Sequence, residues 1–170
     1  NQSETQNQDQ TDEFGKIKPE KKSKEDEAKP DAPSILVVED DYEIRKNLCS
    51  MLQNAYNVDE AENGLAAYEL ILHRAYNLVI SDIMMPKMNG LELCSKIKSN
   101  PQTNHMIVVL LSAKDELESE MEGYKTGANI YLSKPFLPQK LLSIIKNQLY
   151  TQQKAITHHT DTHSDDSKQL

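Results

Sequence analysis

Short apolar runs alternate with segments of helical periodicity along the middle of the chain, and this alternation limits the fold more than any other feature. Runs such as Ile35–Val38 and Leu78–Ile80 are continuously apolar, which is typical of parallel strands buried on both faces. Between the runs, apolar residues recur at helical spacing, as Ile44, Leu48 and Leu52 do. Because parallel strands need helical crossovers, the sequence predicts an α/β fold with a doubly wound, five-stranded parallel sheet.

The expected strands and helices follow one another in strict alternation. Asp41 is placed to cap the first helix. The fourth helix, Asp115 to Lys125, is strongly polar, so we expect it to be weakly anchored and movable. We expect the five strands at residues 35–38, near 56–58, and at 78–80, 107–111 and 130–132.

The two ends of the chain differ in composition from its middle. Apolar residues make up 37% of the 170-residue chain, below the roughly 45–50% of globular domains, and the deficit lies at the ends. Such polar segments cannot offset the entropy of ordering by burial. We therefore predict a disordered linker over residues 1–33, one folded domain over 34–150 and a disordered tail over 151–170.

Charge, hydropathy and cysteine content exclude several classes of partner. The net charge is −8, and no segment carries the basic excess that phosphate-backbone contacts need, so we expect no direct contact with nucleic acid. No apolar run approaches the roughly 20 residues of a membrane span. Cys49 and Cys94 form no paired motif, which suits free thiols in a reducing compartment. We expect a cytoplasmic protein.

Polar residues follow four of the predicted strands at the point where each strand ends. They are Glu39 and Asp40 after the first, Asp82 after the third, Ser112 after the fourth and Lys134 after the fifth. The carboxyl ends of parallel strands meet at one edge of a sheet, so these side chains should converge. Three clustered carboxylates need a compensating cation, and an all-oxygen ligand set favours Mg²⁺ over zinc.

This set of groups suits the transfer of a phosphoryl group. A carboxylate such as that of Asp82 can act as a nucleophile and form an acyl phosphate. The ammonium of Lys134 and the metal would neutralise charge on the transferred oxygens, and the Ser112 hydroxyl would donate to one of them. Each residue alone has an ordinary alternative, as a helix cap, a loop hydroxyl or a solvated lysine. Those alternatives do not explain five compatible groups at one edge of a sheet.

With these motifs, the sequence resembles the receiver domains of bacterial two-component response regulators. The resemblance covers residues 34–150 and implies a flavodoxin-like fold of five strand-helix units. Separations of 43 residues from Glu39 to Asp82, 30 more to Ser112 and 22 more to Lys134 match the family pattern. The matching stretches are ILVVEDD (35–41), SDIMMP (81–86) with Asn89-Gly90, LSA (111–113) and YLSKPF (131–136).

The resemblance assigns a role to each residue of the site. It implies that Asp82 accepts the phosphoryl group and that Mg²⁺ is held by Glu39, Asp40, Asp82 and the backbone carbonyl of Met84. By the same resemblance, Ser112 and Lys134 contact the phosphoryl group, and the peptide bond before Pro135 is cis. It also implies a switch in which Ser112 and Tyr131 move together and change the surface formed by the fourth helix, the fifth strand and the fifth helix. The alternative for Tyr131 is simple packing at the sheet edge.

Partners and context are also implied by the resemblance. The domain should receive its phosphoryl group from a phospho-histidine donor kinase domain and act on an effector through the switching surface, and a homodimer on phosphorylation is compatible with this. SDIMMP and the charged lead-in favour a receiver taken from a hybrid sensor histidine kinase, whose parent could be anchored in the inner membrane. The alternatives are a stand-alone response regulator and a pseudo-receiver that only binds partners.

Whether the domain counts as an enzyme is left open, because its chemistry would be confined to its own phosphorylation and dephosphorylation. An aspartyl-phosphate phosphatase would need a second acid two residues after Asp82, and Met84 occupies that position. An apolar side chain there cannot orient an attacking water, so we expect slow hydrolysis of the phosphoryl group.

Overall fold

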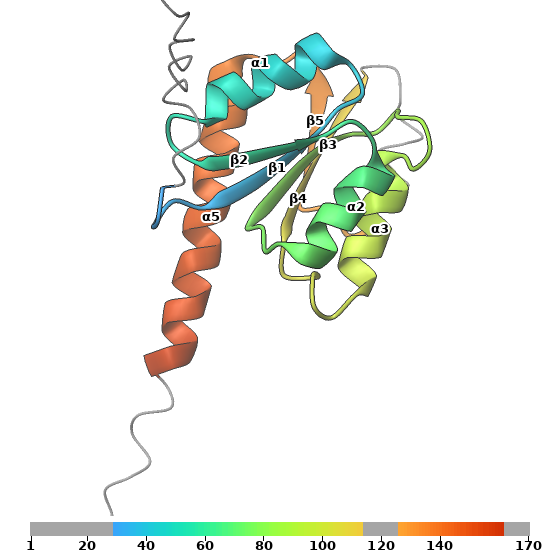
Figure 1. The fold of residues 1–170 in the computed structure, drawn as a ribbon. Helices are drawn as coiled ribbons and strands as arrows, with labels where there is room; N and C mark the ends of the chain where they lie inside the picture. The colour runs from blue at the N-terminus through green and yellow to red at the C-terminus, as the bar shows by residue number, and fades with distance from the viewer. Residues whose placement is uncertain (1–28, 114–125, 162–170) are drawn as a thin grey trace, which may run out of the picture.

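Five parallel strands form one sheet in the order β2-β1-β3-β4-β5 in the computed structural model, which describes residues 29–113 and 126–161 (Figure 1). This order confirms the predicted doubly wound sheet, because the chain adds strands first on one side of β1 and then on the other. The strands are β1 (Ser34–Val38), β2 (Asn57–Ala61), β3 (Leu78–Asp82), β4 (Ile107–Ala113) and β5 (Ile130–Lys134).

Helices cover both faces of the sheet. Figure 1 shows α2 (Gly64–His73) and α3 (Gly90–Ser99) side by side on one face, while α1 (Tyr42–Leu52) and α5 (Pro138–Asp161) lie on the other. Alternate residues of the central strands point to opposite faces, so each face has its own apolar cluster. The predicted fourth helix, Asp115 to Lys125, lies outside the described residues.

The register of the sheet brings the ends of β1, β3, β4 and β5 together. Val38 pairs with Ser81, so Glu39, the next residue, emerges beside Asp82. Asp82 in turn pairs with Leu111, the residue before Ser112. On the far side of β4, Ala113 pairs with Lys134. Four strands therefore deliver their terminal polar residues to one edge, as predicted.

Helix α1 begins at the expected cap, but it buries Arg45 where the sequence pattern predicted Ile44. The side chain of Asp41 caps it by accepting a hydrogen bond of 3.0 Å from the amide of Ile44. Leu48 and Leu52 face the core, whereas the Ile44 side chain is 41% exposed. Arg45 is buried in its place. Its aliphatic stem packs inward and its guanidinium finds backbone acceptors, which hydrophobic periodicity does not predict.

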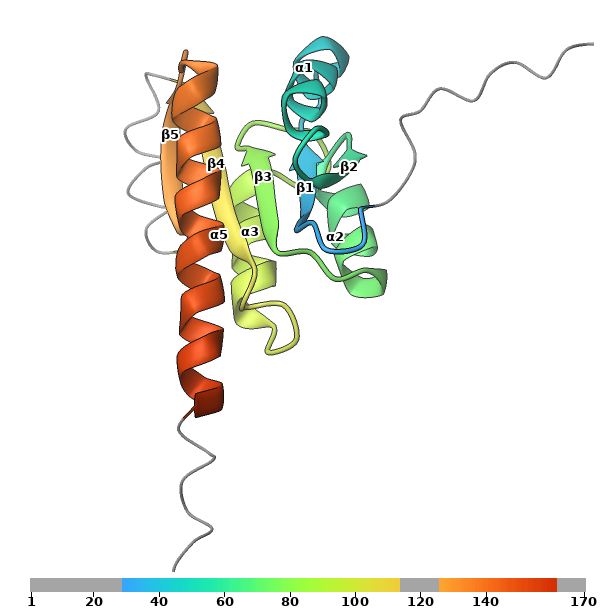
Figure 2. The ribbon, with the colours of Figure 1, turned by 90° about the vertical axis from the view of Figure 1, so that its left-hand side faces the viewer.

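Described structure extends beyond both of the predicted domain boundaries, at residues 33 and 150. Helix α5 continues to Asp161, well past the lower edge of the sheet in Figure 2. Residues 150–161 contain no Gly or Pro that would end the helix. The side-chain amide of Gln152 also donates a hydrogen bond of 2.8 Å to the carbonyl of His105. At the other end, Asn57 binds the backbone of Lys29 through two hydrogen bonds of 2.8 Å. Across the described ranges, none of the helices has the length and apolar character needed to cross a membrane.

Candidate functional site

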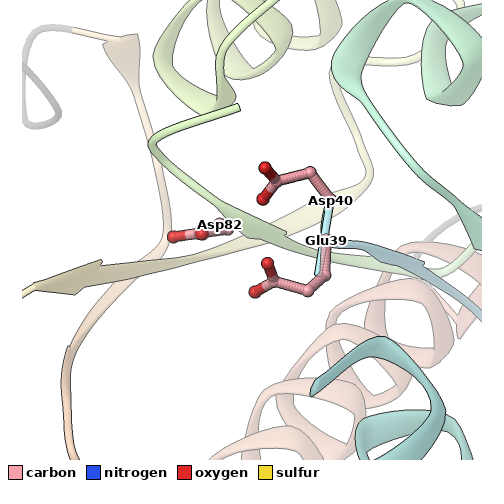
Figure 3. A group of neighbouring side chains, drawn as sticks. All are labelled: Glu39, Asp40 and Asp82. Carbon is pink, nitrogen blue, oxygen red and sulfur yellow. The ribbon is translucent and has the colours of Figure 1, made fainter. Parts of the chain in front are cut away.

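Three carboxylates gather beyond the carboxyl ends of β1 and β3. One oxygen from each of Glu39, Asp40 and Asp82 can be chosen so that all lie within 4.8 Å of one another (Figure 3). Glu39 is buried, Asp82 is half-buried and Asp40 is exposed, so the cluster is covered on one side and open to solvent on the other. Like charges at this separation repel unless a cation lies among them.

Lys134 supplies a cation to this cluster from the end of β5. Its Nζ lies 3.1 Å from Oε2 of Glu39 and 3.3 Å from Oδ2 of Asp82. Burial acts to lower the pKa of Lys134, but the charges of Asp82 and Glu39 outweigh it and raise that pKa above its ordinary value. The lysine is therefore held as an ammonium between the two carboxylates.

Glu39 is the buried carboxylate of the cluster, and its pKa reflects both its burial and the neighbouring charges. Burial raises the pKa of Glu39 above its ordinary value, and the charge of Asp82 acts in the same direction. The amide of Asp41, which donates to Oε1 of Glu39 at 3.2 Å, and the ammonium of Lys134 only partly oppose this. A raised carboxyl pKa beside a second carboxylate is the environment that a bound cation relieves.

The backbone around Asp82 is fixed by close contacts. The amide of Ile83 donates to Oδ1 of Asp82 at 2.8 Å and also to the carbonyl of Leu111 at 3.1 Å. Gly90, the first residue of α3, lies so close that a Cβ added to it would be 2.1 Å from the carbonyl oxygen of Asp82. Only a glycine lets the helix approach the strand end in this way.

Ser112 differs from the other residues of the site because its hydroxyl has no partner among the residues that the structure describes. The side chain is completely buried, one residue beyond the register partner of Asp82, and its Oγ makes no hydrogen bond within residues 29–113 and 126–161. A buried hydroxyl without a partner costs roughly 1–3 kcal/mol. Such a group is explained if it has an acceptor in another state of the molecule.

The remaining residues of the predicted site lie around this cluster. The Met84 side chain is 66% exposed and offers no polar group beyond its backbone. Tyr131, on β5, is partly buried and packs against the apolar cluster on the side of α2 and α3. The peptide bond between Lys134 and Pro135 is cis.

Sequence reasoning missed Arg45, which lies behind the acidic loop. Its Nη1 donates to the carbonyl of Glu39 at 2.7 Å. The signal was available, since a cationic residue occupies a position of α1 one turn before the inward-facing Leu48 and Cys49. It was not used, because charged residues on amphipathic helices are ordinarily assigned to the solvated face.

Comparison with known proteins gives the family of this arrangement. The response regulator receiver domain model matches residues 35–146. The chain belongs to this family. Receiver domains are the signal-accepting modules of two-component systems, so the family places this domain in phosphorelay signalling.

Relatives of this receiver domain occur inside proteins of different architecture. A protein named histidine kinase P4, from Formosa agariphila, is 44% identical over 68% of this chain and 8% of its own length. A probable transcriptional regulator ycf29 from Pyropia yezoensis is 41% identical over 66% of this chain and 51% of its own length. The chain thus spans about half of the length of one of these curated relatives and less than a tenth of the length of the other.

Solved structures agree with the fold described above. The receiver domain protein from Methanospirillum hungatei is 30% identical, with a TM-score of 0.69 over 73% of this chain and 98% of that one. The agreement extends over nearly the whole length of that isolated domain.

Proposed function

We propose that this domain accepts a phosphoryl group on Asp82 from a phospho-histidine of a kinase domain, and that it does so only with Mg²⁺. The observation that carries the proposal is the position of the Asp82 carboxylate, which lies among two further carboxylates and 3.3 Å from the ammonium of Lys134. A carboxylate in this setting is an oxygen nucleophile whose surroundings favour an anionic phosphoryl group only when a divalent cation is also bound.

The residues present fit Mg²⁺. Glu39, Asp40 and Asp82 offer hard oxygen ligands close enough together for one small ion, with no His or Cys among them. The backbone carbonyl of Met84 would complete the protein ligands. When bound, the ion would be held by these oxygens and would offset the negative charge of the carboxylates and of the incoming phosphoryl group.

The transfer needs only the phospho-histidine, the Asp82 carboxylate and a proton from water. An oxygen of the Asp82 carboxylate attacks phosphorus and forms the new P–O bond, while the P–N bond to the donor histidine breaks. The imidazole nitrogen leaves with the electron pair and takes up a proton. Lys134 holds its ammonium at the edge where the phosphoryl oxygens arrive, and so stabilises the charge that builds up on them.

The signal would begin at Ser112. A phosphoryl group on Asp82 supplies the acceptor that this buried hydroxyl lacks, so phosphorylation favours the conformation in which Ser112 reaches it. Movement of Ser112 frees space beside β5, and Tyr131 is large enough to turn into it. The affected surface would include β5, α5 and the segment between β4 and β5.

Beryllofluoride, which imitates the phosphoryl group, tests this switch. In the presence of Mg²⁺ it should shift NMR signals across residues 112–136 of the unsubstituted protein, and far less in Ser112→Ala. Shifts confined to the surroundings of Asp82, or equal in both proteins, would leave Tyr131 as a residue that only packs against the sheet.

We also propose that the domain is part of a hybrid sensor histidine kinase and works on its cytoplasmic side. The similarity to a small part of a histidine kinase supports this, as do the charged residues before the domain. A stand-alone regulator remains the alternative, and the reading frame of the full gene decides between them. A transmitter kinase domain encoded upstream is the expected result.

A further inference from the structure

Arg45 joins the loop that carries two of the three acids to the body of the domain. Its Nη1 donates to the carbonyl of Glu39 at 2.7 Å and lies 3.4 Å from the carbonyl of Asp40. Its Nε lies 3.8 Å from Oε1 of Glu60 on β2. One guanidinium therefore connects α1, the loop after β1 and the neighbouring strand.

The surroundings of Arg45 fix the guanidinium in place. The side chain is only 10% exposed, and its guanidinium carbon lies 5.6 Å from the centre of the Tyr42 ring. Glu60 is itself held by Lys46, whose Nζ is 2.8 Å from Oε1. A buried arginine with this many contacts loses little further freedom when it binds the loop.

The contacts to the loop go to its backbone and not to its carboxylates. Glu39 and Asp40 keep their side-chain oxygens for the cluster with Asp82, while their carbonyls are held from the opposite side by Arg45. The amide of Glu39 also donates to the carbonyl of Ala61 at 3.1 Å, and Lys134 contacts the Glu39 carboxylate at 3.1 Å. Arg45 thus holds the backbone of both acids from the side opposite the carboxylate cluster.

Metal sites depend on groups of this kind. Residues that orient metal ligands without touching the metal typically change metal affinity 10- to 100-fold when they are replaced. A lysine cannot replace this arginine fully, because its single ammonium lacks the planar set of donors that places Nη1 at the loop carbonyls while Nε faces Glu60.

We infer that Arg45 is a positioning residue for divalent-cation binding, which it controls by orienting the backbone of Glu39 and Asp40. This inference rests on the proposed function, since it concerns the affinity of the same acidic site. It predicts that Arg45 acts on Mg²⁺ affinity more than on the phosphoryl-transfer step once Mg²⁺ is bound.

The test compares Arg45→Met, Arg45→Lys and Lys46→Met with the unsubstituted protein. Lys46→Met is the matched control, because it removes the shorter ion pair of Glu60 and leaves the loop untouched. Mg²⁺ is titrated, with the amide NMR signals of residues 39–41 and 82 as the readout, and urea unfolding is measured in EDTA. We expect the Mg²⁺ dissociation constant to rise at least about tenfold in Arg45→Met, to rise less in Arg45→Lys and to stay within about twofold in Lys46→Met.

Kinetics with acetyl phosphate provide a second readout. At saturating Mg²⁺ the maximal phosphorylation rate of Arg45→Met should return to within a few-fold of the unsubstituted rate. Mg²⁺ affinity in folded Arg45→Met within about twofold of the unsubstituted value would overturn the inference. If Arg45→Met does not fold, unchanged affinity in Arg45→Lys overturns it instead. An unsubstituted protein that binds no Mg²⁺ at all would overturn the proposed function, and this inference with it.

Discussion

The ammonium nitrogen of Lys134 lies 3.3 Å from Oδ2 of Asp82, although 52 residues separate the two in the sequence. The pairing of β3 with β4, and of β4 with β5, brings them to one edge of the sheet. In the unphosphorylated protein this contact offsets part of the charge on the acidic cluster. Under the proposed function, the same ammonium would contact the phosphoryl oxygens on Asp82.

Replacing Lys134 by Met should separate metal binding from phosphoryl transfer. Loss of one positioned charge that stabilises the transition state costs about 100-fold or more in rate. Mg²⁺ should bind at least as tightly as before, because the substitution removes a competing cation from beside Glu39 and Asp82. The two quantities are measured by acetyl phosphate kinetics and by Mg²⁺ titration. Lys140→Met, at an exposed lysine of α5, is the control and should change neither.

Ser112→Ala should stabilise the unphosphorylated domain. The substitution removes a buried hydroxyl that has no partner, so the free energy of unfolding should rise by about 1 kcal/mol. Urea unfolding in EDTA measures it. The higher free energy of unfolding should be accompanied by smaller NMR shifts on addition of beryllofluoride, because the hydroxyl that would bind it is absent. A loss of stability of similar size would mean that the hydroxyl does have a partner in the unphosphorylated state.

Gly90→Ala should displace the strand end that carries Asp82. The new Cβ would lie 2.1 Å from the carbonyl oxygen of Asp82 and 3.0 Å from Cα of Ile83, both backbone atoms, so strand or helix must move. We expect a loss of about 1–3 kcal/mol in stability and a larger loss of phosphorylation than stability alone explains. Gly127→Ala is the control, because its cost arises from a φ of +81° away from the site. Its phosphorylation should be unaffected under conditions where it is folded.

Cys49 should react slowly with iodoacetamide at neutral pH. Burial, together with the charge of Glu60, raises the pKa of the Cys49 thiol to about 11, so at pH 8 roughly one thiol in a thousand is ionised. Alkylation mapped by mass spectrometry should accelerate as the pH approaches 11, and should be about a hundredfold faster at pH 8 in urea-unfolded chain. Rapid alkylation of Cys49 in the folded protein at pH 8 would contradict the raised pKa.

The same shift makes Cys49 a source of alkaline instability. A raised pKa keeps the thiol protonated in the folded state after the unfolded chain, at about its ordinary value of 9, has begun to ionise. The contribution to stability is therefore complete below pH 9 and is lost as the pH rises from about 9 to about 11. Cys49→Ala should have a smaller loss of stability across this window, as measured by thermal unfolding.

Much of the fold could be predicted from the sequence because the strands of a parallel sheet bury both faces. Continuous apolar runs such as Ile35–Val38 located the central strands, and the polar residue after each run located the site. The edge strand β2 is only half-buried for most of its length, so its pattern was weaker and its range less certain. The doubly wound arrangement then followed from the connection rules for parallel strands.

The features that could not be predicted depend on single long-range hydrogen bonds. Gln152 extends α5 by binding the carbonyl of His105, and Asn57 orders the lead-in by binding Lys29. The polar composition of both segments predicts that they bury little apolar surface and remain disordered. Composition does not reveal individual hydrogen bonds such as these two. Arg45 was missed for a different reason, because charged residues of an amphipathic helix are ordinarily assigned to the solvated face, although its position one turn before Leu48 indicated the inward face.

The most direct measurement is the site and metal dependence of phosphorylation by acetyl phosphate, followed by intact-mass and peptide mass spectrometry. The account predicts one phosphoryl group per chain, located on Asp82, formed with Mg²⁺ and absent when EDTA is added or when Asp82 is replaced by Asn. Asp82→Asn labelled at the unsubstituted rate, or labelling that EDTA does not reduce, would contradict it.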